Sequence, residues 1–241
     1  IDGNAHKILW INKTIAVRNK QVIEPYKTYV DREGNYWVTT NALSLIYDVK
    51  EKKWYDSLPE FLRHLGITCP WQNVLIKDIA EDKNGRVLIA TDHNGLILVD
   101  LNKREIENYI YDKSDVGSIP DNTLQCVFVD NSSDALWIGT YKNGVAYYSS
   151  LSSRFGLIPV GDVCTITQDK NGLFWFGTND SGILSYNPIT GESVNYRMGE
   201  TGLGSDIVVS SLSAHDGSLW FGTYEGGLAR YRDGHFSVYR A

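Results

Sequence analysis

The chain has 241 residues, of which 42% are hydrophobic and 22% charged, and this composition is typical of a soluble globular protein. The formal net charge of −6 argues against a nucleic-acid-binding surface, which needs basic side chains. No run approaches the ~20 apolar residues of a membrane-spanning helix. Because the chain begins at Ile1 and its single methionine is Met198, we expect it to be a piece of a longer polypeptide.

Units of one pattern follow one another along the chain. The pattern that the full units share is an alternating apolar strand, an Asp, a turn Gly, a second strand with Trp-apolar-Gly-Thr, a Gly-containing hairpin and a third strand that usually ends in Tyr. A fourth strand usually follows, for example EIENYIY at 105–111. The predicted units lie near residues 2–24, 26–56, 74–111, 123–160, 163–198 and 207–240. They are all predicted to be antiparallel β-sheet.

The Trp position of the second strand fixes the repeat. In the five full units it holds Trp37, Leu88, Trp137, Trp175 and Trp220. Four-stranded units at a period of about 40–50 residues are typical of a β-propeller. The first unit, 2–24, places Trp10 at the same position but lacks a first strand. We therefore predict a single all-β domain, a β-propeller of four-stranded antiparallel blades with five full blades and one partial blade. A piece of a larger propeller is favoured over a six-bladed ring with an imperfect seam.

Two segments interrupt the repeat. Leu58, Phe61, Leu62 and Leu65 have the spacing of one or two amphipathic helical turns. Residues 112–122 (DKSDVGSIPDN) are predicted to be an exposed loop. Neither segment is long enough for a second domain.

Most of the repeated residues are predicted to be structural. The carboxylates of Asp82, Asp130 and Asp169 are expected to cap turns rather than to act as acid–base catalysts. The Trp side chains are expected to pack between blades. Gly139, Gly177 and Gly222 follow them, because bulky neighbours leave no room for a side chain.

The cysteines and histidines form no recognisable chemical motif. Cys126 and Cys164 occupy equivalent strands but are one residue out of phase, and successive strand residues point to opposite faces of a sheet. We therefore expect both to be buried free thiols rather than partners in a disulfide. The third cysteine is Cys69. No catalytic motif was found, and no pair of the five histidines has helix-face metal spacing. No cofactor, metal site or catalytic residue is therefore predicted.

The segments ALWIGTYKNGVAYY, LFWFGTNDSGILSY and SLWFGTYEGGLARY resemble the two-component regulator propeller repeat. The units at Trp37 and Leu88 depart from that pattern, with Thr39 and Ala90 in place of the Gly before Thr. The resemblance implies the extracytoplasmic, periplasmic sensor region of a hybrid histidine kinase of the Bacteroides type. It also implies seven-bladed propellers, a homodimeric receptor, and a membrane span and kinase outside this chain. Many members of the family detect breakdown products of complex glycans.

A ligand is expected over the central funnel, on the face that carries the hairpins between the second and third strands. Aromatic rings stack on sugar C–H faces, while amides and acids bond hydroxyls. The predicted ligand is an oligosaccharide or another small polar molecule. The candidate site residues are Tyr141, Tyr224, Trp71, His93, Asp92, Lys142, Asn179, Asp180 and Glu225.

The sequence thus favours a non-catalytic, carbohydrate-sensing propeller module of a two-component signalling protein. Two alternatives stay open. One is a stand-alone propeller enzyme, a lyase or glycosidase that acts on polysaccharide. The other is a protein-interaction scaffold.

Overall fold

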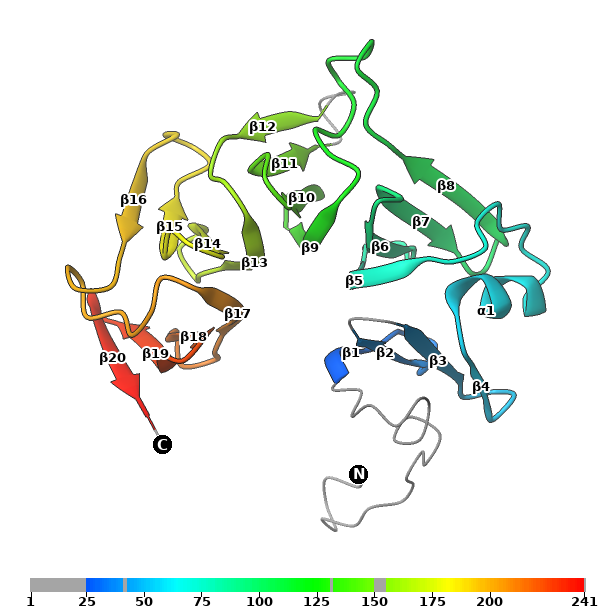
Figure 1. Ribbon diagram of the computed structural model, residues 1–241, viewed down its shortest axis with the longest axis horizontal. Coiled ribbons are helices and arrows are strands. Elements are labelled where there is room, and N and C mark those ends of the chain that lie inside the picture. The colour runs from blue at the N-terminus through cyan, green and yellow to red at the C-terminus, as the bar shows by residue number, and fades with distance from the viewer. Residues whose placement is uncertain (1–24, 41–42, 131, 150–154, 241) are drawn as a thin grey trace.

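The computed structural model describes residues 25–40, 43–130, 132–149 and 155–240. In these residues, strands β1 to β20 form five four-stranded antiparallel sheets, each with its strands in chain order. The sheets stand as blades around a common axis, with the first strand of each blade innermost (Figure 1). The predicted all-β propeller is confirmed. The partial blade predicted at 2–24 lies outside the described residues.

The strand bounds follow the repeat. Blade 1 consists of β1 (Pro25–Val30), β2 (Tyr36–Thr40), β3 (Ser44–Asp48) and β4 (Lys53–Tyr55). Blade 2 consists of β5 (Leu75–Glu81), β6 (Val87–Asp92), β7 (Leu96–Asp100) and β8 (Glu105–Tyr109). Blade 3 consists of β9 (Leu124–Asp130), β10 (Ala135–Thr140), β11 (Val145–Tyr148) and β12 (Gly156–Ile158).

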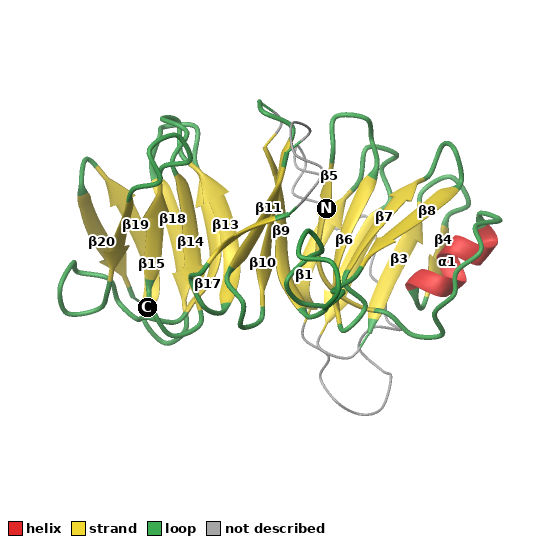
Figure 2. Ribbon diagram, turned by 90° about the horizontal axis from the view of Figure 1, so that it is seen from above, coloured by secondary structure: helices red, strands yellow, loops and turns green. Residues whose placement is uncertain are grey.

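Blade 4 consists of β13 (Val163–Gln168), β14 (Phe174–Thr178), β15 (Ile183–Tyr186) and β16 (Ser193–Tyr196). Blade 5 consists of β17 (Val208–Ser213), β18 (Leu219–Thr223), β19 (Gly227–Arg232) and β20 (His235–Tyr239). Seen from the side, the strands of all five blades run between two layers of loops (Figure 2).

The helix α1 (Leu58–His64) follows blade 1 and confirms the expected helical turns. Ser57 caps it, since its hydroxyl accepts a hydrogen bond from the Glu60 backbone N–H at 3.3 Å. Its buried side chains complete the hydrophobic cluster between blades 1 and 2. They are Leu58, Pro59, Phe61 and Leu62.

The hydrophobic core is divided among the interfaces between consecutive blades. Four clusters of buried side chains join blades 1 and 2, 2 and 3, 3 and 4, and 4 and 5. Trp37, Trp137 and Trp175 are at most 5% exposed, as predicted for packing between blades. The ring of Trp175 lies 4.6 Å from that of Tyr231 in blade 5, centroid to centroid. Trp220 differs, because it is only half-buried.

The repeated carboxylates hold turns, as predicted. Oδ1 of Asp82 accepts hydrogen bonds from the backbone N–H groups of Asn84 and Arg86, both at 2.9 Å. Gly85 completes this turn with φ +77°, in the left-handed region that glycine adopts without strain. In blade 1 the equivalent Asp31 also accepts from Nε1 of Trp37 at 2.8 Å, which ties the turn to the indole.

Close approach of the next blade explains two of the three predicted small-residue positions. A Cβ on Gly139 would lie 2.7 Å from the carbonyl oxygen of Val163, and one on Gly177 would lie 2.7 Å from Cγ1 of Val208. Both contacts belong to the following blade. A Cβ on Gly222 would meet only Ser210 of its own blade.

Two expectations need correction. The 112–122 loop is not wholly exposed, because Ile119 is 0% exposed and belongs to the cluster between blades 2 and 3. Its apolar side chain fills space that the two sheets leave open. All three cysteines are free, but only Cys126 is fully buried, whereas Cys164 is half-buried. The reason lies in the register of the inner strands.

Each inner strand contains one bulged residue. In blade 3, Cys126 pairs with Gly139 and Leu124 pairs with Thr140, which leaves Gln125 without a partner in the ladder. The same interruption recurs in the other four blades. The bulged residues are Tyr26, Lys77, Gln125, Cys164 and Val209. Because Cys164 sits on a bulge and Cys126 does not, their side chains have different surroundings.

Candidate functional site

The hairpins between the second and third strands lie at one end of the blades, together with the loops that enter each blade. Backbone hydrogen bonds connect the two kinds of loop. Tyr141 N–H donates to the Thr123 carbonyl at 3.0 Å, and Asn179 N–H donates to the Asp162 carbonyl at 3.0 Å. These contacts fix the hairpin side chains relative to the inner strands, so loop-borne residues stand on a rigid scaffold.

A polar cluster of this face lies between blades 3 and 4, where β9 and β13 begin. Burial raises the pKa of the Asp162 carboxyl, and the nearby charge of Asp180 raises it further. Hydrogen bonds from Asn179 and Gln125, together with the positive charge of Lys142, oppose this rise. We call these five residues the mouth cluster.

Asp162 has spare hydrogen-bonding capacity. Its Oδ1 atom is shielded from solvent and has no hydrogen-bond partner among the described residues. A buried acceptor that is left unsatisfied costs about 1–3 kcal/mol. A hydrogen-bond donor that reached this Asp162 oxygen would remove that cost.

Two hairpins of this face carry exposed tyrosine rings. Tyr141 is 41% exposed, and Nζ of Lys142 lies 4.8 Å from the centroid of its ring. Tyr224, on the equivalent hairpin of blade 5, is 57% exposed. Exposed tyrosine rings on ordered hairpins offer flat surfaces with a polar end.

A second charged group lies on the hairpin of blade 2. Nδ1 of His93 is 2.5 Å from Oδ1 of Asp92, and Nζ of Lys77 is 3.4 Å from Oδ2 of the same carboxylate. His93 has φ +74°, so the hairpin places it in the left-handed region. Asp92 therefore contacts both His93 of the hairpin and Lys77, the bulged residue of the inner strand β5.

The structure brings together only some of the nine predicted site residues. Lys142, Asn179 and Asp180 meet around Asp162, and Asp92 meets His93. Trp71 instead packs, half-buried, against the cluster between blades 1 and 2, which gives this ring a structural role that its loop position did not reveal. Glu225 stands on the blade 5 hairpin with φ +56°.

Sequence reasoning missed the bulged residues as a group. Lys77 contacts the predicted site residue Asp92, and Gln125 contacts Asp162, although neither Lys77 nor Gln125 lies on a hairpin. The offset between Cys126 and Cys164 gave no signal, because both inner strands have the bulge at the equivalent position. Bulges of this kind commonly re-aim side chains next to functional sites.

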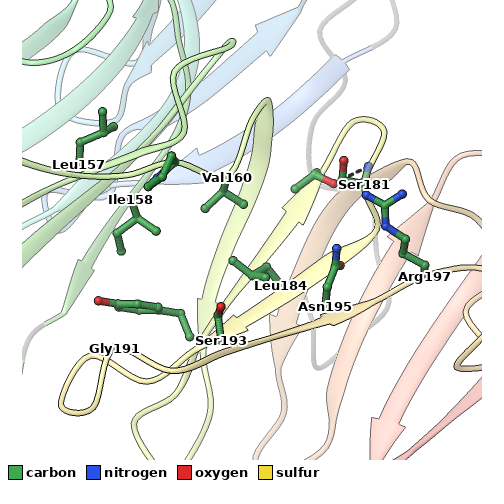
Figure 3. Close-up of a pocket in the computed structure, with 12 residues that line it drawn as sticks. Leu157, Ile158, Val160, Ser181, Leu184, Gly191, Ser193, Asn195 and Arg197 are labelled. Carbon is green, nitrogen blue, oxygen red and sulfur yellow. Dashed lines mark hydrogen bonds between the residues drawn. The ribbon is translucent and has the colours of Figure 1, made fainter.

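An open cavity of about 520 Å³ lies beside the mouth cluster, between β12 of blade 3 and β15 and β16 of blade 4 (Figure 3). Leu157, Ile158 and Val160 form its apolar side, and Ser181, Asn195 and Arg197 line the other. Oγ of Ser181 donates to Oδ1 of Asp180 at 2.8 Å. The 179–182 hairpin thus borders both the mouth cluster and the cavity. None of the predicted site residues lines the cavity.

The described residues contain neither a candidate metal site nor a candidate membrane-spanning helix. No three His, Cys, Asp or Glu side chains are grouped so that they could hold a metal ion. No helix in the same part of the chain has the length and apolar character needed to cross a membrane.

The protonation of Cys164 gives a test of the mouth cluster. Burial, reinforced by the charge of Asp162, raises the pKa of this thiol to about 11. Since the thiolate is the reactive form, we expect maleimide labelling of Cys164 to be slow at pH 8 and to accelerate up to pH 11. The variant Asp162→Asn removes the neighbouring charge and should label faster at pH 8, as measured by mass spectrometry. Equal rates in both proteins would place the Asp162 carboxylate away from Cys164.

The comparison with protein families finds one match. Residues 157–180 match the model described as two component regulator propeller. This segment is similar to a two-component regulator propeller repeat. The repeat includes the turn residues Asp169 and Gly172, the buried Trp175 and the hairpin residue Asn179. The predicted resemblance is therefore confirmed, and the matched segment contains three of the five residues of the mouth cluster, Asp162, Asn179 and Asp180. The comparison with curated proteins found no match.

Solved structures share the fold. The extracellular domain of a hybrid two component system from B. thetaiotaomicron superposes with a TM-score of 0.72 at 18% identity, over 87% of this chain and 29% of that one. Streptogramin B lyase gives 0.64 at 15% identity, over 89% and 67%. PorZ of Porphyromonas gingivalis, a component of the type-IX secretion system, gives 0.63 at 15% identity, over 89% and 34%. This chain thus spans less than a third of the first structure. At these identities the three show a shared propeller fold.

Proposed function

We propose that this chain is a non-catalytic, ligand-sensing propeller module of a two-component signalling protein, with the histidine kinase elsewhere in the full-length polypeptide. The observation that carries the proposal is the family repeat at 157–180. The fold shared with an extracellular domain of a hybrid two component system supports it. The module belongs, on this proposal, to the periplasmic part of an inner-membrane receptor that is a homodimer. Any contact with the membrane is made by segments outside this chain.

The chemistry of the mouth cluster supports a polyhydroxylated ligand, an oligosaccharide. Carboxylates and amides accept and donate hydrogen bonds in the directions that sugar hydroxyls require. Asp162 has an acceptor atom without a partner, and a sugar O–H is a suitable donor for it. The exposed ring of Tyr141 offers a stacking surface beside this acceptor.

Calorimetric titration with a panel of oligosaccharides tests this proposal. For the best ligand, we expect Tyr141→Ala and Asn179→Ala each to weaken binding by about 3–10-fold, the equivalent of one stacking contact or hydrogen bond. Tyr109→Ala is the matched control, since Tyr109 is similarly exposed, at 38%, but lies on the outer strand β8. Binding that is unaffected by the first two variants would exclude the mouth cluster as the ligand site.

The same titration separates the alternatives. Turnover of a bound polysaccharide, detected as steady product release, would favour a lyase or glycosidase. Absence of binding to every oligosaccharide in the panel would favour a protein-interaction scaffold. Retained binding without product release supports the sensor.

A further inference from the structure

Blade 2 differs from the other four described blades in having no tryptophan at the Trp position. Leu88 stands there, whereas Trp37, Trp137 and Trp175 are buried in the other three interfaces between consecutive blades. A leucine side chain is much smaller than an indole, and a close-packed interface is sensitive to such a loss of volume. The interface between blades 2 and 3 therefore lacks one ring that the other interfaces have.

A cavity of about 340 Å³ lies at this interface. Its apolar wall includes Leu88 together with Leu96 and Leu98 of the third strand, β7. The equivalent cavity between blades 4 and 5 has a volume of about 320 Å³ and is lined by Trp175, but by no described residue of the corresponding strand β15. The smaller side chain thus opens the third strand of blade 2 to the cavity. Pockets that bind small molecules commonly measure about 300–1,000 Å³.

Aromatic rings of the following blade are arranged alike at the two interfaces. In blade 5, the ring of Tyr231 lies 4.6 Å from that of Trp175 and 4.9 Å from that of Phe236, centroid to centroid. In blade 3, Tyr148 corresponds to Tyr231 by strand register, and its ring lies 5.3 Å from that of Phe155. Tyr148 and Phe155 both line the cavity. Two rings near the indole of one interface thus have counterparts in the other, where the indole is missing.

The N–H of an indole also has a matching acceptor in blade 2. In blade 1, Oδ2 of Asp31 accepts two hydrogen bonds, from Nδ2 of Asn35 at 3.0 Å and from Nε1 of Trp37 at 2.8 Å. At the equivalent turn of blade 2, Oδ2 of Asp82 accepts from Nε of Arg86 at 2.6 Å, and no other described residue donates to it. Asp82 lines the cavity. This oxygen therefore keeps the acceptor position that Trp37 uses in blade 1.

We propose that the cavity between blades 2 and 3 binds a small aromatic molecule of the indole class, whose ring takes the place of the missing tryptophan side chain. The ring packs against Leu88, Tyr148 and Phe155, and its N–H donates to Oδ2 of Asp82. An apolar cavity beside a small side chain can bind an aromatic molecule that fits it. The proposal is independent of the sensor function, because the turn of Asp82 joins the first strand to the second, at the end of the blade opposite to the hairpins.

Calorimetric titration of the 241-residue chain with indole tests the proposal. We expect saturable 1:1 binding. The compound 1-methylindole has no N–H donor, so it should bind about tenfold more weakly, the value of one hydrogen bond to a charged group. Absence of indole binding overturns the proposal, and so does equal affinity for the two compounds, since the contact with Asp82 is then not made.

The variant Leu88→Trp supplies the indole from the chain itself. It should abolish indole binding and unfold in denaturant at a midpoint no lower than that of the parent protein. Leu212→Trp is the matched control, because Leu212 is 61% exposed and lies on β17 of blade 5. This control should bind indole like the parent protein. Undiminished binding by Leu88→Trp overturns the proposal, and a lower midpoint for this variant does so as well, because the cavity then has no room for an indole.

The tryptophan side chain of a peptide offers the same chemistry as a free indole compound. Titration with N-acetyltryptophanamide separates the two sources. Binding at least as tight as that of indole, and lost in Leu88→Trp, assigns the cavity to a tryptophan-containing peptide. Weaker binding than that of indole assigns it to a free indole compound.

Discussion

Replacing Trp175 with Ala should be the most destabilising of the single substitutions considered for this protein. Trp175 is 2% exposed and contacts rings of both blade 4 and blade 5, including Tyr196 and Phe221. Removing a buried indole leaves a cavity that the surrounding sheets fill only in part, at a cost of about 3–5 kcal/mol. Denaturant unfolding monitored by circular dichroism would show the loss as a lower midpoint.

Trp220→Ala is the matched control, because it removes the same side chain from the same position of the repeat. Trp220 is half-buried and stacks on Tyr239 and Arg230 of its own blade rather than on a following blade. We expect a cost of about 1 kcal/mol, the typical value for a point substitution. Equal losses for the two variants would show that the Trp220 side chain is as closely packed as that of Trp175.

Asp31→Ala is the second substitution with a large expected effect. Asp31 is 4% exposed, and its carboxylate accepts hydrogen bonds from Nε1 of Trp37, the backbone N–H of Asn35 and Nδ2 of Asn35 at 2.8–3.0 Å. Without the carboxylate, buried donors lose their acceptor, and each such group costs about 1–3 kcal/mol. We expect a total of about 3 kcal/mol, measured by the same unfolding experiment.

Asp82→Ala serves as the comparison at the equivalent turn of blade 2. There the Trp position holds Leu88, so no indole depends on the carboxylate. The partners of Asp82, Asn84 and Arg86, are on an exposed turn and can turn to water. The expected cost is about 1 kcal/mol. A loss as large as that of Asp31→Ala would mean that the turn itself, rather than the tie to Trp37, provides the stability.

The fold could be predicted because the repeat is local. Each unit of the sequence contains most of the shared pattern of turn, Trp position and hairpin, so the repeat predicts the blades and most of their strands. The short helix α1 was also predictable, since its apolar spacing lies within eight residues.

The site could be predicted only in part, because its members come from different blades. Lys142, Asn179 and Asp180 were found by their place on hairpins, but Gln125 and Lys77 belong to strands and gave no sign in a single unit. Trp71 shows the opposite case. It lies on a loop, as a binding residue would, yet it packs half-buried against the cluster between blades 1 and 2.

The five bulges affect which substitutions the inner strands can accept during evolution. A bulged residue takes no part in the ladder that holds its blade together, so a replacement there leaves the pairing of the inner strand intact. Lys77, Gln125, Cys164 and Val209 are a cation, an amide, a thiol and an aliphatic group at one equivalent position. Substitutions at these four positions can therefore change the inner strands one blade at a time, while the repeat that builds each blade stays constant.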